Sequence, residues 1–387
     1  MRLLHTADWH VGKAIRGRSR LAESAAALAE VTGIAVDEGV DAVLVAGDVY
    51  DQRAAAPEAD AIVFETLVRL SEAGIPVVVI PGNHDSALRF EALGKLLAPI
   101  GVTVVARVVA PDGGGVVEVP ARDGSDAALI ACIPFVPERR FGDAAALFDA
   151  TEAWYRSYAD GMGELLAAMA GAFRPDRVNV ALGHLFTDGA LVGGGERELT
   201  IGMAYAVSPG RLPGTAQYVA LGHVHKPQSI PAAPAPTRYA GSVLQLDFGE
   251  RDQTKSVSIV DASPGRPAKV REVELTSGRR LLDLHGTLDE VAAQAGDVGD
   301  AFLRVFVTTD GPVPGIADRI RDDLPNALDV HLVYERAEAE GRAGAPVSSL
   351  APRDQFLAYY RSQHGADPEE RLLESFDEVL AAEAGEL

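Results

Sequence analysis

Five short polar segments contain most of the side chains in this chain that could bind metal ions and act on a substrate. They are Asp8-x-His10, Gly47-Asp48, Gly82-Asn83-His84-Asp85, Gly183-His184 and Gly222-His223-x-His225. Each follows an apolar run, and the single cysteine, Cys132, lies outside all of them. Carboxylate, imidazole and amide ligands without a thiolate suit manganese, iron or zinc rather than a structural zinc cage.

The number of candidate ligands indicates two metal ions. The seven candidates are Asp8, His10, Asp48, Asn83, His184, His223 and His225. One four-coordinate ion cannot use them all, whereas two ions about 3.5–4 Å apart that share a carboxylate can. Such a pair activates a water and stabilises the attacking and leaving oxygens of an in-line displacement at phosphorus. A single segment of this kind is more often an ordinary turn, but five in one chain are a specific signal.

The elements that must position these segments are predicted to be strands. The apolar runs cover residues 2–7, 41–46, 77–80, 178–182 and 218–221, and a polar segment follows each of them. Helices predicted over about 20–38 and 57–73 alternate with the first three strands, which is typical of a layered α/β domain. Glycine at the strand ends allows the backbone to turn sharply, so that the ligands can point into one crevice.

The middle of the chain completes this domain. A helix is predicted over 86–98, and residues 101–134 alternate short β runs with glycine-rich turns, which indicates antiparallel strands in a mixed sheet or sandwich. Residues 143–172 are alanine-rich and are predicted to be helical.

The composition is that of a soluble globular protein. The chain has 387 residues, of which 47% are hydrophobic and 24% charged. One cysteine excludes a disulfide framework and suits a reducing cytosol. The N-terminus becomes charged too early for a signal peptide, and no apolar run reaches the roughly 18 residues of a membrane span. We therefore expect a cytoplasmic protein without a membrane segment.

Charge is unevenly distributed along the chain. The formal net charge of -21 argues against a general nucleic-acid binder. Residues 1–20 nevertheless carry five basic side chains against one acid. Arg16, Arg18 and Arg20, just beyond the first polar segment, are therefore candidates for contacts with the phosphates of DNA. For each of them, ordinary solvated charge is the alternative interpretation.

The motifs DWH, GDVYD, GNHD, GH and GHVH resemble those of the calcineurin-like metallophosphoesterases, whose fold is a β-sandwich flanked by helices. The runs LHTADWHVG and GSVLQLDFGE resemble more closely the nuclease subunits of bacterial complexes that contain a long coiled-coil ATPase. This resemblance implies a nuclease that needs two manganese ions, with magnesium or another divalent ion as the alternative. It also implies action on double-stranded DNA ends, hairpins and single strands in repair, recombination and replication, by a homodimer within a heterotetramer.

The same resemblance implies a role for each polar residue. Asp8, His10 and His225 match the ligands of the first ion, Asn83, His184 and His223 match those of the second, and Asp48 matches the bridging carboxylate. His84 matches a histidine beside the scissile phosphate, where an imidazole can protonate the leaving oxygen or stabilise charge. Asp51 stands where some relatives have histidine. We interpret Asp51 and Asp85 as groups that orient ligands, with loop capping as an equal alternative.

The sequence divides into four parts. Residues 1–270 are the predicted nuclease domain, 271–337 a small α/β domain that caps it, and 338–350 a linker. Residues 351–387 are predicted to form two short helices, the second with an apolar stripe of Leu372, Leu373, Phe376, Val379 and Leu380. Such a stripe can pack on the protein's own core or bind a partner's helices, and the resemblance implies the ATPase as that partner.

Two other functions remain open at this point. A different two-metal phosphodiesterase or phosphatase can use the same fold and ligands, because a fold does not fix a substrate. A scaffold in which the ions are only structural is the second alternative. Its weakness is that it leaves His84 without a role.

Overall fold

The computed structural model describes residues 1–148, 157–196, 205–334, 351–364, 367–368, 370–373 and 375–377. The chain forms two compact units, Met1–Tyr334 and Glu335–Leu387. Among the described residues, no helix is both long enough and apolar enough to cross a lipid bilayer.

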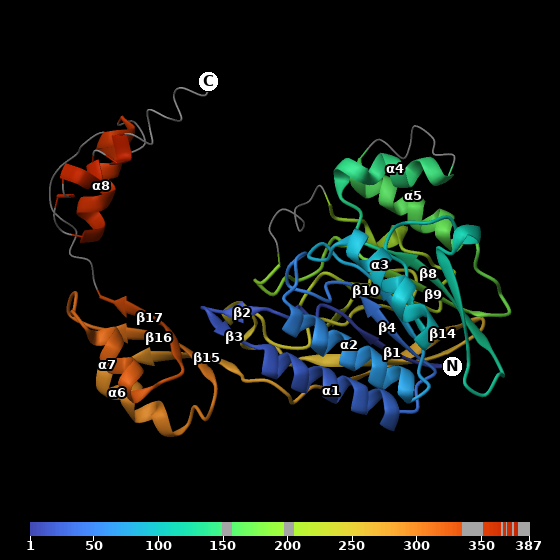
Figure 1. The fold of residues 1–387 in the computed structure, drawn as a ribbon, viewed down its shortest axis with the longest axis horizontal. Helices are drawn as coiled ribbons and strands as arrows, with labels where there is room; N and C mark the ends of the chain where they lie inside the picture. Colours follow the sequence, from blue (N-terminus) through green and yellow to red (C-terminus); the bar gives the residue numbers. More distant parts are fainter. Residues whose placement is uncertain are drawn as a thin grey trace. The chain divides into compact units, whose positions relative to one another are not determined.

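Two six-stranded sheets form the main body of the first unit (Figure 1). The first contains β1 (Arg2–Thr6), β4 (Ala42–Ala46), β5 (Val77–Ile80), β6 (Val102–Val104), β13 (Ser256–Ser263) and β14 (Arg266–Glu274). The second contains β7 (Val116–Pro120), β8 (Ala127–Ile133), β9 (Val178–His184), β10 (Tyr218–Gly222), β11 (Gln228–Ser229) and β12 (Thr237–Tyr239). Their strand orders are β14-β13-β1-β4-β5-β6 and β11-β12-β10-β9-β8-β7.

The strands that precede the polar segments run parallel to one another within each sheet. β4 pairs in parallel with β1 on one side and β5 on the other, and β10 pairs in parallel with β9. β4 and β5 consist only of alanine, valine, leucine and isoleucine, which suits strands buried on both faces. Because parallel strands end at the same edge, the segments that follow them are brought together.

The two sheets pack face to face. Leu44 and Ile80 of the first sheet and Ile130 and Leu182 of the second belong to one cluster of fully buried side chains. This cluster is the inner layer of the core, and the alternate residues of the same strands point outward.

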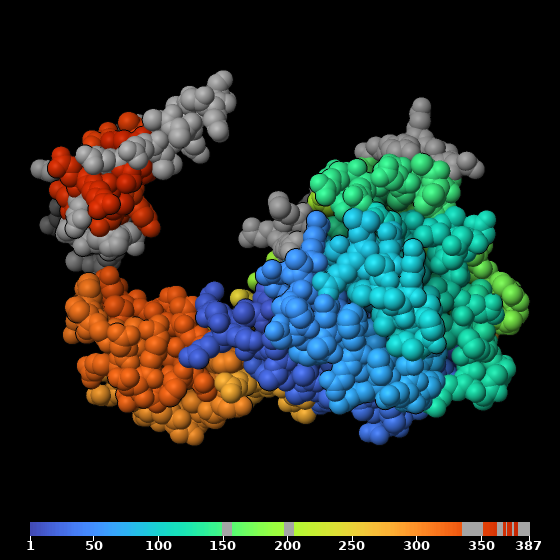
Figure 2. All heavy atoms as spheres, in the orientation of Figure 1, coloured from blue at the N-terminus to red at the C-terminus, as the bar shows by residue number. Residues whose placement is uncertain are grey.

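Helices cover the outer faces of both sheets. On the first sheet these are α1 (Leu21–Asp37), α2 (Pro57–Glu72) and α3 (Ala87–Leu97), which contribute Leu28, Leu70 and Phe90 to the core. In the space-filling view they close this face of the molecule (Figure 2). The second sheet is covered by α4 (Phe141–Ala145) and α5 (Tyr158–Ala170). The predicted β-sandwich flanked by helices is confirmed.

The stretch predicted to be helical over 143–172 differs in detail. It contains the end of α4 and the separate helix α5, while residues 149–156 lie outside the described part. Ser157 begins α5 as its N-cap, because its hydroxyl accepts a hydrogen bond from the backbone N–H of Asp160 at 3.1 Å. Alanine content alone did not reveal this second start.

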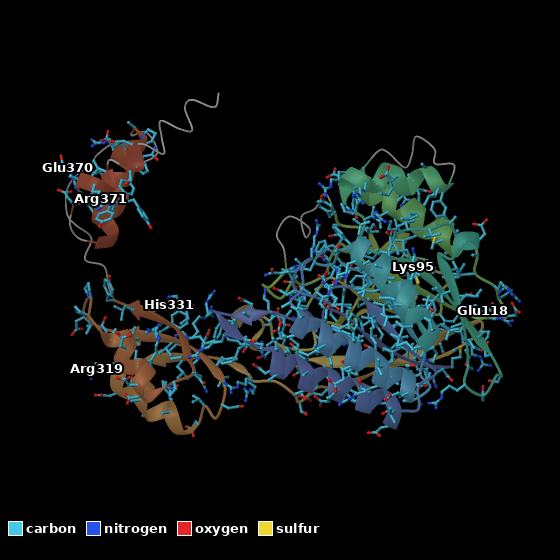
Figure 3. All side chains as sticks on the ribbon, viewed as in Figure 1. Lys95, Glu118, Arg319, His331, Glu370 and Arg371 are labelled. Atoms are coloured by element: carbon cyan, nitrogen blue, oxygen red, sulfur yellow. The ribbon has the colours of Figure 1, made fainter. Side chains whose placement is uncertain are left out.

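A third sheet of three parallel strands follows. It contains β15 (Leu281–Gly286), β16 (Phe302–Thr308) and β17 (Ala327–Val333), with the helices α6 (Leu288–Ala293) and α7 (Ile316–Asp323). This sheet has its own hydrophobic core, which includes Leu303, Val305 and Ile320. Figure 3 labels His331 on β17 and Arg319 on α7. Phe302 joins Ile15 and Phe248 in a smaller cluster, which connects this sheet to the sandwich.

The remaining elements are short. The hairpin β2 (Ala14–Ile15) and β3 (Arg18–Ser19) follows β1. In the second unit, α8 (Pro352–His364) packs Phe356 against Phe376, with ring centroids 4.3 Å apart. The predicted linker 338–350 lies outside the described residues, as do Val379 and Leu380 of the predicted stripe.

Candidate metal centre

All seven candidate ligands lie at the carboxyl ends of parallel strands. Asp8 and His10 follow β1, and Asp48 follows β4. The others follow β5, end β9 or follow β10: Asn83, His184, His223 and His225. Every one is buried, with at most 4% of its surface exposed. The structure thus brings together all seven residues predicted from the sequence.

The loops that carry these ligands are conformationally strained. Five non-glycine residues have a positive φ among the described residues, and four are candidate ligands: Asp8 (49°), His10 (44°), Asp48 (49°) and His223 (104°). A non-glycine residue in this region costs on the order of 1–3 kcal/mol and persists only where its surroundings enforce it. Such strain is concentrated at functional sites, and here it aims the side chains inward.

Two glycines are required because the loops approach one another closely. A Cβ at Gly82 would overlap the carboxylate of Asp48, and a Cβ at Gly47 would overlap the ring of His184. Gly47 also has a φ of 90°, which other residues rarely adopt. These glycines therefore let the ligands from the two sheets meet.

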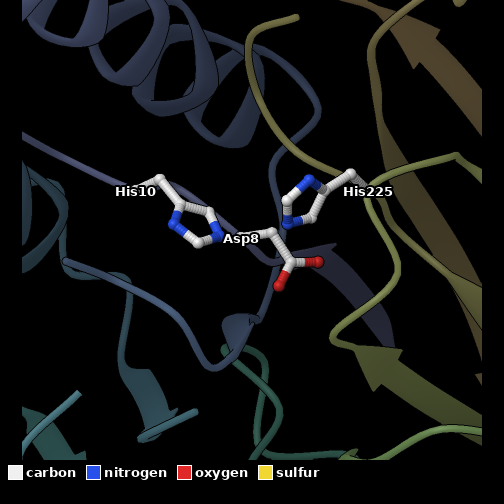
Figure 4. A group of neighbouring side chains, drawn as sticks. All are labelled: Asp8, His10 and His225. Atoms are coloured by element: carbon white, nitrogen blue, oxygen red, sulfur yellow. The ribbon is translucent and has the colours of Figure 1, made fainter. Parts of the chain in front are cut away.

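Asp8, His10 and His225 form the first ligand group. One ligand atom of each lies within 4.8 Å of the other two, and the two imidazoles face the carboxylate from either side (Figure 4). The carboxylate of Asp8 also accepts a hydrogen bond from the backbone N–H of His223, at 3.0 Å. The ring centroids of His10 and His225 are 4.9 Å apart.

Asn83, His184 and His223 form the second ligand group. Oδ1 of Asn83 lies 3.0 Å from Nε2 of His184 and 2.8 Å from Nδ1 of His223. Nδ1 of His184 lies 2.7 Å from the carbonyl oxygen of Ala46 and donates to it, so that Nε2 faces Asn83. One amide oxygen thus meets two imidazole nitrogens.

Asp48 lies between the two groups. Its Oδ2 is 3.6 Å from Nε2 of His10 in the first group and 3.5 Å from Nε2 of His184 in the second. Asp48, His184 and His223 also place ligand atoms within 4.8 Å of one another. A carboxylate in this position can reach an ion on either side.

Burial and mutual charge shift the pKa values of these groups. Burial raises the pKa of Asp8 to about 7, against the opposing effect of His184. Burial also acts to raise the pKa of Asp48, but the neighbouring histidines outweigh it and hold that pKa well below its usual range. Burial lowers the pKa of His10 to about 4. These environments keep Asp48 an anion and His10 a neutral imidazole, which are the ligand forms that a cation needs.

His84 lies beside the two ligand groups, and one of its ring nitrogens is within 4.8 Å of ligand atoms of His10 and Asp48. Its backbone N–H donates to Oδ1 of Asp48 at 2.8 Å, and its ring centroid lies 4.6 Å from that of His10. Nδ1 lies 2.7 Å from the carbonyl oxygen of Asp51 and donates to it. This contact fixes the ring, so Nε2 is the nitrogen that can exchange a proton with a substrate.

Asp85 and Asp51 contact the ligand loops rather than the centre itself. The carboxylate of Asp85 accepts hydrogen bonds from the backbone N–H groups of Val49, Tyr50 and Gly82, and so joins the loops after β4 and β5. Oδ1 of Asp51 lies 3.4 Å from Nδ1 of His10. Asp85 therefore caps loops, while Asp51 is placed to orient a ligand.

Sequence reasoning did not identify a buried ion pair behind His225. Nδ1 of His225 donates to Oε1 of Glu250 at 2.9 Å, and Oε2 of Glu250 accepts from Nζ of Lys255 at 2.7 Å. Glu250 has no measurable exposure, and its pKa is held below the usual range because Lys255 and His225 outweigh the effect of burial. The only signal in the sequence was the segment GSVLQLDFGE, whose last residue is this glutamate.

The three arginines expected to meet DNA have different environments. Arg20 is only 1% exposed, forms an ion pair with Glu23 at 2.6 Å and donates to the carbonyl oxygen of Gln245. Its predicted contact with phosphates is therefore wrong, because a buried and paired guanidinium cannot reach DNA. Arg16 is half exposed and lies 3.0 Å from Asp329, whereas Arg18 is exposed on β3.

The donor set fits divalent metal ions. Both ring nitrogens of His10 are buried, and neither makes a hydrogen bond with the residues that the structure describes, although Nδ1 lies 3.4 Å from Oδ1 of Asp51. A buried polar atom left unpaired costs about 1–3 kcal/mol, and a metal ion would satisfy one of the two. Nitrogen and oxygen ligands on both sides of a shared carboxylate are the arrangement expected for a two-metal centre.

Comparisons with known proteins agree with this geometry. A family model described as calcineurin-like phosphoesterase matches residues 1–227. The SbcD subunit of the nuclease SbcCD from Bacillus subtilis (strain 168) is 34% identical over 394 residues, which cover 98% of each chain. The SbcD subunits of Rhodobacter capsulatus and Escherichia coli K12 are 32% and 31% identical, over 90% and 88% of this chain and 91% and 86% of theirs.

Proposed function

Because this chain belongs to the calcineurin-like phosphoesterases, as a metal-dependent phosphodiesterase and nuclease subunit of the SbcD type, we propose that it is a manganese-dependent DNA nuclease. It degrades double-stranded ends as an exonuclease and cuts single strands and hairpins as an endonuclease. The observation that carries the proposal is the position of Asp48, 3.6 Å from His10 on one side and 3.5 Å from His184 on the other.

Two manganese ions fit the two ligand groups. Asp8, His10 and His225 would hold one, Asn83, His184 and His223 would hold the other, and Asp48 lies where it could reach either. When bound, two such ions provide Lewis acidity to a water nucleophile and to the oxygens of the phosphodiester.

The chain's own residues orient the substrate and move protons. Nε2 of His84 gives a proton to the leaving oxygen or stabilises the charge that develops on it. The bond from Nδ1 of His84 to Asp51 keeps this ring in place, and Asp51 also orients His10. Glu250 holds His225 with Nε2 toward Asp8, because it accepts the proton on Nδ1.

The sheet β15-β16-β17, within the proposed capping domain 271–337, lies beside the hairpin β2-β3. Arg16 on the hairpin turn pairs with Asp329 on β17. Arg18 is exposed on the same hairpin and is the remaining N-terminal candidate for a phosphate contact. We expect this region to contact DNA that enters the metal centre.

The partner is a coiled-coil ATPase, SbcC, bound by residues 351–387. The relatives are named as parts of a complex, SbcCD, and this name supports such an assembly. In the second unit, Leu372 is 41% exposed and is available for an apolar contact. We further propose that two copies of the chain form the centre of a heterotetramer.

The test is a manganese-dependent assay on plasmid, hairpin and single-stranded DNA, with and without the ATPase. We expect cleavage that His84→Ala reduces by at least 100-fold without loss of bound metal. Hydrolysis of a small chromogenic diester without DNA cleavage would instead indicate another phosphodiesterase on this fold. Full activity of His84→Ala would contradict the role of the imidazole.

Removal of residues 345–387 tests the partner site. We expect the truncated chain to lose binding to the ATPase in a pull-down and to keep manganese-dependent cleavage of short single strands. Retained binding would contradict the assignment of this segment.

A further inference from the structure

A cavity of about 380 Å³ adjoins the metal centre on the side of the second ligand group. Its walls come from the loop of Pro81 to Asn83, the first turn of α3 and the segment from Phe135 to Leu147. The volume is in the range of about 300–1,000 Å³ that is typical of small-ligand sites. Asn83 lines this cavity and is also a candidate metal ligand, so a molecule held here would lie next to the metal centre.

Three arginines without acidic partners surround this cavity. Arg53, Arg139 and Arg140 are exposed, and none of them has a carboxylate at ion-pairing distance within the described residues. Most of the other arginines that the structure describes are paired, as Arg107 in the same wall is with Glu91. A guanidinium with free donors binds phosphate oxygens with two parallel hydrogen bonds.

The same cavity has an apolar wall. Leu88 is 67% exposed and Leu147 50% exposed, although both are large hydrophobic residues. Phe135 joins this wall to the metal centre, because its ring stacks on that of His223 with centroids 6.4 Å apart and an angle of 25°. Exposed apolar side chains gathered around a pocket favour a ligand with an apolar or aromatic part.

The acidic residues of the lining do not cancel this positive charge. Asp85 is buried, and its oxygens accept the three backbone N–H groups described above. Asp143 is exposed and is the second acid of the lining. The three arginines without an ion pair therefore face one acid of the lining, Asp143, that is not used inside the protein.

We propose that this cavity is a nucleotide subsite. It holds the nucleotide next to the scissile phosphodiester, with Arg53, Arg139 and Arg140 on a phosphate and the base against Leu88 and Leu147. This inference rests on the proposed nuclease function, since it names where that nuclease holds part of its substrate. It predicts that a free nucleoside monophosphate competes with the substrate.

The test uses the full chain with manganese and the chromogenic substrate bis(p-nitrophenyl) phosphate. The inhibition constants of the 5′- and 3′-monophosphates of deoxyadenosine and of inorganic phosphate are measured. In Arg53→Ala/Arg139→Ala/Arg140→Ala we expect the inhibition constant of at least one deoxyadenosine monophosphate to rise at least tenfold. Leu88→Ser should weaken inhibition by that nucleotide but not by inorganic phosphate, because only the nucleotide has a base.

Arg319→Ala is the matched control. Arg319 is also exposed and without an acidic partner among the described residues, but it lies on α7 of the third sheet. We expect its inhibition constants to stay within twofold of those of the wild type. Unchanged nucleotide inhibition in the triple variant, or an equal rise in Arg319→Ala, would overturn the subsite.

Failure of the nuclease proposal gives a different result. In that case the wild-type chain hydrolyses no DNA, and calorimetric binding of the same two monophosphates still tests the cavity. If the wild-type chain binds a monophosphate and the triple variant does not, the proposed subsite stands. If the wild-type chain binds neither monophosphate, the proposed subsite is rejected.

Discussion

The two ligand groups on either side of Asp48 are supported in different ways. In the first group, His225 donates to Glu250, which is held in turn by the buried ammonium of Lys255. In the second, His184 donates to the backbone carbonyl of Ala46 on β4. One half thus depends on a charged pair of side chains, either of which a substitution can remove. The other depends on a strand that the sandwich positions in any case.

This difference has consequences for stability and for tolerance to mutation. A buried ion pair is favourable only while both partners are present, because the loss of one leaves an uncompensated charge that costs about 3–5 kcal/mol. The carbonyl of Ala46 cannot be removed by a side-chain substitution. We therefore expect the first group to be the more vulnerable one, and the residue between the groups to affect both.

The largest effect is expected for Asp48→Asn. An amide of the same shape cannot serve two ions as a bridging anion, so kcat/KM on single-stranded DNA should fall by about 10³-fold or more. Manganese titration by calorimetry should show weaker binding in both halves. Activity within tenfold of the wild type would contradict the proposed role of Asp48 as the carboxylate shared by two ions.

An intermediate effect is expected for Glu250→Gln/Lys255→Met. The double variant removes the carboxylate from His225 without leaving an unpaired ammonium, and loss of such an outer contact typically weakens metal affinity about 10–100-fold. Calorimetry should show a lower affinity for one manganese ion and an unchanged affinity for the other.

Lys255→Met alone is the control for this experiment. It leaves Glu250 on His225, so metal affinity should be kept while the protein unfolds at a lower temperature. If the double variant lost affinity equally for both manganese ions, the two ligand groups would not be supported independently.

The smallest effect is expected for Phe135→Leu. The ring packs on His223 in the second group, and a conservative apolar replacement usually costs less than about 1.5 kcal/mol. Manganese affinity should therefore fall less than tenfold, in the second half only. A larger loss of manganese affinity than in Glu250→Gln/Lys255→Met would mean that the second ligand group, not the first, is the more vulnerable one.

The sequence was sufficient to predict which candidate ligands lie together, but not the contacts that support them. Asp8, Asp48 and His184 could be found because each follows an apolar run that predicts a strand, and parallel strands end together. Glu250 could not be found in this way. It lies in a short 3-10 turn 25 residues beyond His225, and neither a strand nor a periodic pattern marks it.

Charge read from the sequence was equally incomplete. Arg16, Arg18 and Arg20 looked equivalent, but only the fold shows that Arg20 is enclosed with Glu23 while Arg18 remains exposed. Arg53 is far in the sequence from the consecutive pair Arg139 and Arg140, and folding brings all three around one cavity. Whether a basic residue is available for a phosphate contact depends on the ion pairs that it forms in the folded protein, and the sequence alone does not reveal these pairs.

We propose that Asp48 lies between two metal ions. Crystals of the full chain grown with manganese and measured at the manganese absorption edge test it directly. We predict two anomalous peaks about 3.5–4 Å apart, with the carboxylate of Asp48 in contact with both. A single peak, or a second peak away from Asn83, His184 and His223, would contradict the proposed two-metal centre.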